Sequence, residues 1–179
     1  THEDLAHRGR FLNARDTLRA LLEWRVLPIF NENDTVAVAE IKVGDNDNLS
    51  SLVASMIEAD LLILLSDVAG LYDADPRSVP TAARIPVVRR IDAAVRKLAG
   101  GAGTRAGTGG MITKIEAAER AAASGIPTVI AAGMEPAILQ DIVAGRDVGT
   151  LFLPKAGRLG ARKHWIAFTL KPAGRLLLD

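Results

Sequence analysis

Helical and strand-like patterns alternate along most of this sequence, and the alternation is what most restricts its fold. Apolar runs typical of buried strands occur at residues 26–30, 61–65, 127–132 and 149–153. Helix-forming stretches occur between and around them, at residues 11–24, 49–59, 111–124 and 136–144. Because strands that alternate with helices form parallel units, the pattern predicts an α/β fold with a largely parallel sheet.

Some stretches fall outside this alternation. Turn-forming residues dominate residues 70–86, which predicts an irregular segment, and a short helix at 91–98 leads into glycine-rich sequence. The helix from Leu49 is expected to begin at an N-cap, either Asp47 or Asn48. From Lys155 the chain is basic, and a last strand is expected in WIAFTL at 165–170.

Composition excludes several classes of protein. The 179 residues are 49% hydrophobic and carry a net charge of +1, so the overall balance indicates neither a nucleic-acid nor a membrane partner. The absence of cysteine excludes disulfides and thiolate metal sites. No apolar run is long enough to span a membrane, and no signal peptide is recognisable in THEDLAHRGR. A cytoplasmic protein is therefore expected.

Polar clusters follow the expected strands, where open parallel sheets bind their ligands. These clusters are NEND at 31–34, SDVAGLY at 66–72 and AAG at 131–133, with GDNDN at 44–48 just ahead of a helix. Asp34, Asn46, Asp47 and Asn48 offer carboxylates and amides that can hold an amine and orient charged groups. The alternative interpretation is a pair of turns rich in Asx residues, followed by a helix cap.

The stretch GTGGMITK, residues 107–114, combines glycines, a helix start and Lys114. Glycines let backbone N–H groups point into a concave site and the lysine adds a charge, so an anion-binding loop is favoured over a flexible linker. The spacing is neither that of a Walker A motif nor that of a dinucleotide fingerprint. Asp67, in SDVAGLYDADP, either contacts a nucleotide or caps a turn. No histidine has metal-ligand spacing, so no residue is assigned to a metal.

Five segments together carry a resemblance to a known family. They are FLNARDTL, NENDTVAVAEIKVGDNDNLS, LLSDVAGLYDADPR, GTGGMITK and VGTLF. In this order they resemble the glutamate 5-kinase family, a branch of the amino acid kinases, over nearly the whole chain. The resemblance implies a three-layer α/β sandwich with a mostly parallel sheet. It also implies ATP-dependent phosphorylation of the γ-carboxylate of L-glutamate with Mg, in proline biosynthesis, with proline as feedback inhibitor and a homo-oligomeric assembly.

The same resemblance assigns roles to individual residues. Asp34 and Asn46 would bind glutamate, while Asp47 and Lys114 would be catalytic, Asp47 by organising lysines and Lys114 by neutralising the transferring phosphoryl group. This division suits phosphoryl transfer, which depends on positioning and on spread positive charge. Nucleotide-binding positions would be Ser66, Asp67, Thr108, Gly109, Gly110, Met111, Ile112, Thr113 and Lys114.

The resemblance also implies a domain organisation. Residues 1–154 would form the C-terminal part of the kinase domain, and 155–179 a basic connection with its last strand. The family's N-terminal strand with a phosphate-binding lysine, and its C-terminal RNA-binding-like domain, would lie outside this sequence. These 179 residues alone are therefore expected to be weak or inactive catalysts that still bind nucleotide. Two alternatives remain open: a nucleotide-binding or assembly module without catalysis, and a related kinase of another acidic substrate.

Overall fold

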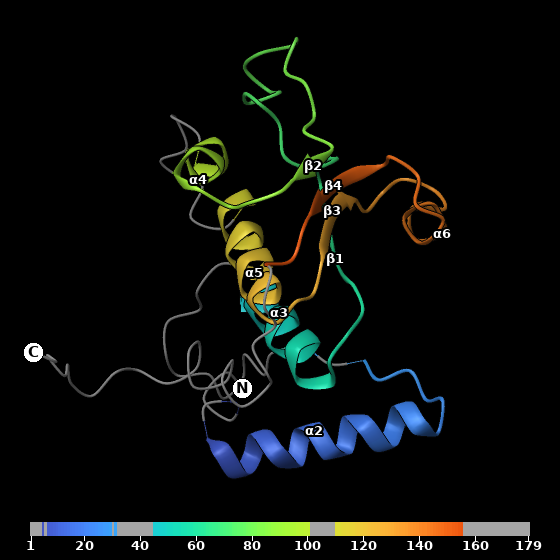
Figure 1. Cartoon of the computed structure of the whole chain (residues 1–179). Helices are drawn as coiled ribbons and strands as arrows, with labels where there is room; N and C mark the ends of the chain where they lie inside the picture. Colours follow the sequence, from blue (N-terminus) through green and yellow to red (C-terminus); the bar gives the residue numbers. More distant parts are fainter. Residues whose placement is uncertain (1–4, 6, 30, 32–44, 101–109, 156–179) are drawn as a thin grey trace, which may run out of the picture.

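The computed structural model describes residues 5, 7–29, 31, 45–100 and 110–155, and within them helices and strands alternate as expected (Figure 1). None of the described helices is both long and apolar enough to cross a membrane. The elements are α2 (Arg8–Glu23), α3 (Asp45–Ile57), β1 (Leu62–Ser66), β2 (Val87–Val88), α4 (Ala93–Gly100), α5 (Met111–Ala123), β3 (Thr128–Ala132), α6 (Ile138–Val143) and β4 (Gly149–Phe152).

The strands form one mixed sheet in the order β1-β3-β4-β2. β1 pairs with β3 in parallel and β2 pairs with β4 in parallel, while β3 and β4 are antiparallel. The expected α/β class with a mostly parallel sheet is confirmed, and the antiparallel pair at its centre is a feature that the sequence pattern did not predict.

Alternate residues of each strand face different layers of the molecule. Leu64, Ile130 and Phe152 belong to the core that the sheet shares with α5, in which Ile115 is fully buried. Their neighbours along the strands, such as Val129, pack against α6 on the other face. This period of two is what strands require when both faces are covered, so helices lie on both sides of the sheet.

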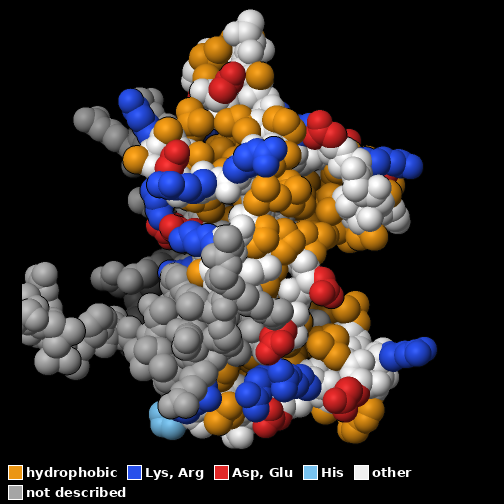
Figure 2. Space-filling view, viewed as in Figure 1, with side chains coloured by type: hydrophobic (Ala, Val, Ile, Leu, Met, Phe, Trp, Pro, Cys, Tyr) orange, Lys and Arg blue, Asp and Glu red, His pale blue; other side chains and the backbone are white. Residues whose placement is uncertain are grey.

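Helix α2 packs against α3 rather than against the sheet. Phe11 and Met56 belong to a separate apolar cluster between the two helices. In Figure 1 α2 accordingly lies across the end of the molecule opposite β2. Hydrophobic side chains gather on the face seen in Figure 2. Leu65 of β1 and Val143 of α6 are among the exposed hydrophobic residues.

The strand expected at residues 26–30 does not form over Val26–Ile29, and Phe30 lies outside the described residues. Arg25 has a φ of 56° and turns the chain at the end of α2. The segment that follows is 81% exposed at Leu27 and pairs with no described strand. Because a strand needs a neighbour for its backbone hydrogen bonds, apolar sequence alone did not make one here.

Helix α3 also differs from expectation, since its helical residues begin by Asp45 and not at Leu49. Asp47 and Asn48 are therefore inside its first turn and are not N-caps. Their carbonyl oxygens accept hydrogen bonds from the hydroxyls of Ser50 and Ser51. Carboxylates in a first turn also complement the helix dipole.

Two further differences concern residues 70–98. Val87 and Val88 form the short strand β2, which was not predicted. Helix α4 begins at Ala93, two positions after the expected start, because the Asp92 carboxylate accepts a hydrogen bond from the Val95 backbone N–H at 3.0 Å. That bond is the N-cap interaction of an aspartate. The strand expected at 165–170 lies outside the described residues.

Replacement of Ile115 by alanine tests the core beneath the sheet. Ile115 is fully buried between α5 and the strands. The cavity left by Ile115→Ala should lower the free energy of unfolding by about 2–5 kcal/mol in urea denaturation. Val143→Ala, at a side chain that is 78% exposed, is the control and should change it by less than about 0.5 kcal/mol. Equal effects of the two substitutions would contradict this description of the core.

Candidate functional site

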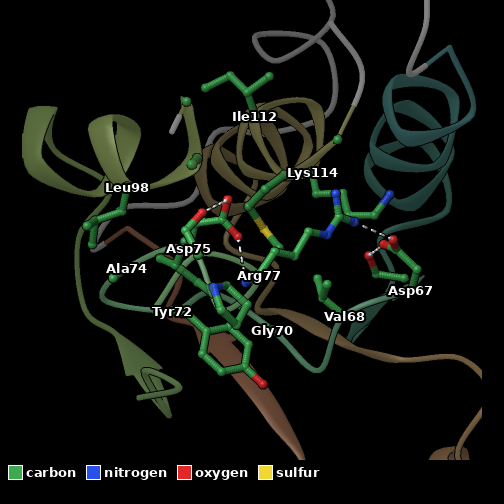
Figure 3. Close-up of a pocket in the computed structure, with 18 of the residues that line it drawn as sticks. Asp67, Val68, Gly70, Tyr72, Ala74, Asp75, Arg77, Leu98, Ile112 and Lys114 are labelled. Atoms are coloured by element: carbon green, nitrogen blue, oxygen red, sulfur yellow. Dashed lines mark hydrogen bonds and ion pairs between the residues drawn. The ribbon is translucent and has the colours of Figure 1, made fainter. Parts of the chain in front are cut away.

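A pocket of about 620 Å³ opens at the carboxyl end of β1, between the loop that follows this strand and the start of α5 (Figure 3). This volume is in the range of pockets that bind small molecules. The pocket is lined by Leu65, Ser66, Asp67, Val68, Gly70, Leu71, Tyr72, Ala74, Asp75, Pro76, Arg77, Ser78, Leu98, Ala99, Gly100, Gly110, Met111, Ile112 and Lys114.

The pocket joins two sets of residues that the sequence singled out separately. Ser66 and Asp67 lie at the end of β1, and Gly110–Ile112 with Lys114 lie at the start of α5. This proximity follows from the topology, because the carboxyl end of a sheet strand and the N-terminus of a helix on that sheet meet at the same edge. The Ser66 hydroxyl lies 3.1 Å from the Asp67 carboxylate, to which it donates.

Lys114 makes the best-defined charged contact of the site. Its Nζ donates to both carboxylate oxygens of Asp47, at 3.0 and 3.1 Å. The side chains of Lys114 and Asp47 are only 15% and 14% exposed. An ion pair with little exposure is screened less by water and salt than a surface pair, so it holds the ammonium group more firmly.

Thr113 completes this cluster on the side away from the pocket. It is buried, and its hydroxyl lies 2.6 Å from Asp47 Oδ2 and 2.9 Å from the Gly110 carbonyl, either of which can accept its proton. Thr113 is not among the pocket-lining residues. Of the residues predicted at the helix start, Thr113 thus contacts Asp47, whereas Lys114 reaches both Asp47 and the pocket.

For the remaining predicted residues, the structure gives either no contact with the pocket or no description. Asn46 is exposed in the first turn of α3, next to Asp47. Asp34, Thr108 and Gly109 lie outside the described residues, and their roles stay predictions. The domain boundary expected between residues 154 and 155 also stays a prediction.

One wall of the pocket consists of residues to which the sequence analysis assigned no role. Residues 71–85 form a hairpin in which Tyr72 and Arg84 are bridged and the Ile85 N–H donates to the Leu71 carbonyl at 2.8 Å. Its tip turns around Asp75, whose carboxylate accepts from the Arg77 backbone N–H and the Ser78 hydroxyl. The Asp-Pro pair at 75–76 signalled a turn but not that the turn would face a pocket.

Arg77 brings a second cation to the pocket. Figure 3 shows its side chain extending toward Asp67, and the two groups are 3.1 Å apart. Both side chains are more than two-thirds exposed, at 71% and 77%. A pair of this kind is weakly held in water, so Arg77 can exchange Asp67 for an anionic ligand.

Together these groups suit an anionic ligand with an apolar part. Lys114 and Arg77 supply positive charge, and the start of α5 supplies backbone N–H groups that have no partner within the helix. Leu98 and Met111 provide apolar lining. These are the features that a nucleotide with its phosphates requires.

Comparison with known proteins places these observations in context. A sequence model of the amino acid kinase family matches residues 4–132. A protein named glutamate 5-kinase from Trichlorobacter lovleyi is 58% identical over all 179 residues, and one from Geobacter sulfurreducens is 54% identical. The match covers 100% of this chain and 48% of each relative, so the chain spans about half their length.

Solved structures resemble the fold at lower sequence identity. An isopentenyl phosphate kinase has a TM-score of 0.51 and 19% identity, over 76% of this chain and 49% of its own. A UMP kinase from Bacillus anthracis has a TM-score of 0.50 and 17% identity, over 79% of this chain and 52% of its own. At these identities the likeness concerns the fold alone.

A double-mutant cycle tests the strength of the ion pair between Asp47 and Lys114. The free energy of unfolding is measured for Asp47→Asn, Lys114→Met and the double variant. Because both side chains have little exposure, the coupling energy should be about 1–3 kcal/mol. The exposed pair of Asp67 and Arg77, treated in the same way, should give less than about 1 kcal/mol. Coupling energies of equal size would contradict the difference in burial.

Proposed function

The chain belongs to the amino acid kinase family, and from that premise we propose that it takes part in ATP-dependent phosphorylation of the γ-carboxylate of L-glutamate. The product would be glutamyl 5-phosphate, in the first step of proline biosynthesis. The observation that carries the proposal is Lys114, held by Asp47 at the edge of a pocket suited to a nucleotide. The names of the relatives at 54–58% identity support the choice of substrate.

In this proposal Lys114 acts on the phosphoryl group in transit. Phosphoryl transfer needs little covalent chemistry from the protein, and most of the catalysis comes from positioning and from preorganised positive charge that stabilises the transition state. Asp47 uses its two carboxylate oxygens to fix the ammonium, which has three N–H donors, and Thr113 supports the carboxylate from behind. The ammonium is thus oriented before substrate arrives, so little reorganisation is needed during the transfer.

The nucleotide would occupy the pocket itself. Its phosphates would lie against the start of α5, along the loop of residues 108–113, with Ser66 and Asp67 near the base or ribose. When bound, Mg²⁺ would neutralise phosphate oxygens and orient them. No group of three or more potential ligands among His, Cys, Asp and Glu occurs in the described parts of the chain, which is compatible with an ion held mainly by phosphates and water.

L-Glutamate would bind beside the phosphates. Asn46 lies next to Asp47 in α3 and is exposed, so its amide can reach a carboxylate of a substrate near Lys114. Asp34 would pair with the α-ammonium group. Proline as a feedback inhibitor, a homo-oligomeric assembly and a cytoplasmic location belong to the same proposal.

A nucleotide-binding module without catalysis is the second candidate. The described part of the chain contributes Ser66, Asp67 and Lys114 to the pocket, while the chain spans only about half the length of its relatives. Nucleotide binding without catalysis is therefore a separate outcome to test. Titration of the chain with ATP, beside an assay of ADP release with and without L-glutamate, separates the two candidates. N-Acetylglutamate, aspartate and UMP replace L-glutamate as controls for a related kinase.

Lys114→Ala tests the catalytic assignment. In a protein of the relatives' full length that contains this chain, loss of one preorganised charged donor should lower kcat for glutamate-dependent ADP release by about 10²–10³-fold, with a smaller change in the KM for glutamate. Lys97→Ala is the matched control, because Lys97 is exposed on α4 and does not line the pocket. Turnover by Lys114→Ala equal to that of Lys97→Ala would remove Lys114 from the mechanism.

Asp34→Ala tests the glutamate site separately. If its carboxylate pairs with the substrate ammonium, the KM for L-glutamate should rise by roughly tenfold or more, since charge-assisted hydrogen bonds contribute about 1.5–3 kcal/mol. The KM for ATP should change much less. Steady-state kinetics with each substrate varied in turn gives both values, and a normal KM for glutamate would rule the assignment out.

A further inference from the structure

A buried hydroxyl of the sheet contacts both ends of the hairpin of residues 71–85. Thr150, in β4, is fully buried. Its hydroxyl accepts a hydrogen bond from the Leu71 N–H at 2.8 Å and donates one to the Ile85 carbonyl at 2.7 Å. Leu71 and Ile85 are the two ends of the hairpin and are also joined by their own backbone hydrogen bond, so the Thr150 side chain ties an already paired base to β4.

The backbone on both sides of this hydroxyl is adapted to it. Gly70 has a φ of 145°, a conformation that side-chain-bearing residues rarely adopt, and a Cβ at this position would clash with the Thr150 hydroxyl. Next to Thr150, the Gly149 carbonyl accepts a hydrogen bond from the Arg84 guanidinium, which also contacts the Asp147 carboxylate at 2.7 Å. The start of β4 therefore holds the hairpin at its base.

The position of the hairpin decides the shape of the pocket. Residues 70–72 and 74–78 form one wall, and the hairpin rises away from the sheet, so its base is where its direction is set (Figures 1 and 3). Beyond the base, the hairpin is held by local contacts such as the Asp73 N–H to Ala83 carbonyl bond, at 3.0 Å, and by the exposed ion pair between Arg77 and Asp67. A change of angle at the base would move residues near the tip, such as Arg77, furthest.

We propose that Thr150 is a positioning residue for nucleotide binding, and that it acts through the hairpin without touching the ligand. This inference rests on the proposed nucleotide pocket. Thr150 is not among the residues that line the pocket, so any effect of its hydroxyl on affinity passes through the residues it contacts at the base of the hairpin, Gly70, Leu71 and Ile85. Loss of the hydroxyl leaves a buried N–H and a carbonyl unsatisfied, which favours a displaced or open hairpin base.

The test compares Thr150→Val, which removes the hydroxyl at nearly constant volume, with Thr150→Ser, which keeps it. Two quantities are measured on the 179-residue chain: hydrogen exchange of the Leu71 amide and the Kd for ATP from titration calorimetry. Thr150→Val should speed the exchange and raise the Kd by about tenfold each, the equivalent of one unsatisfied buried hydrogen bond. Thr150→Ser should leave both within about twofold of the unaltered chain.

Thr128→Val is the matched control. Thr128 is equally buried, in β3 of the same sheet, and its hydroxyl has no hydrogen-bond partner among the described residues. This substitution should change neither quantity. If Thr128→Val weakens ATP binding as much as Thr150→Val does, a general loss of stability explains the effect and the positioning role is overturned. Thr150→Ala replaces Thr150→Val if circular dichroism shows that the valine variant does not fold.

The two measurements, Leu71 hydrogen exchange and the Kd for ATP, distinguish failure of this inference from failure of the proposed nucleotide binding. Faster Leu71 exchange with an unchanged Kd for ATP would overturn the positioning role while leaving nucleotide binding intact. Unchanged exchange would overturn the closure of the hairpin by Thr150. Absence of ATP binding by the unaltered chain would instead overturn the nucleotide pocket, and with it the role proposed for Thr150 in nucleotide binding.

Discussion

The contact between α3 and α5 sets the geometry of the candidate site. It ends in an ion pair of low exposure, in which Asp47 on α3 holds Lys114 on α5. Two charges removed from water are costly when either lacks its partner, so each helix is constrained to present its charge to the other. The start of α5, with the backbone N–H groups of its first turn, is thereby fixed relative to α3. Both helices also pack against the sheet, which relates the pair to the carboxyl end of β1.

Small side chains allow the two helices to lie close enough for this contact. Ser51 is fully buried on α3, and the hydroxyls of Ser55 and Ser124 are 3.1 Å apart at the far end of the helix pair. On α5, alanines at 117, 118 and 121 are fully buried where larger side chains would hold the helices and the sheet apart. Close packing at this end and the ion pair at the other fix both the distance and the rotation of α5. The alanine-rich sequence of α5 therefore contributes to the site indirectly, through the placement of Lys114.

Sequence patterns predicted those parts of the fold that depend on local burial. The strands at 61–65, 127–132 and 149–153 are found within a residue or so, because short apolar runs bounded by turn formers are typical of strands in a largely buried sheet. The apolar residues 26–29 look the same in sequence but are exposed, since a pattern does not reveal whether a neighbouring strand is available. Likewise Asp47 resembled a helix cap, because its partners, Thr113 and Lys114, lie far along the chain. The hairpin was unpredictable for the same reason: its ends are joined through Thr150.

The two walls of the pocket depend on different supports. The α5 wall is set by α3 through Asp47, whereas the hairpin wall is set by β4 through Thr150 and Arg84. The two supports share no residue, since one joins α3 to α5 and the other joins the hairpin to β4, so their free-energy contributions are expected to be nearly additive. For a ligand that contacts both Lys114 and the hairpin, loss of either support would therefore lower the binding free energy independently of the other. Nucleotides have the required extent, with phosphates at one end and a base at the other. Changes at α3 should then act mainly on groups near the phosphates, and changes at β4 on groups near the hairpin.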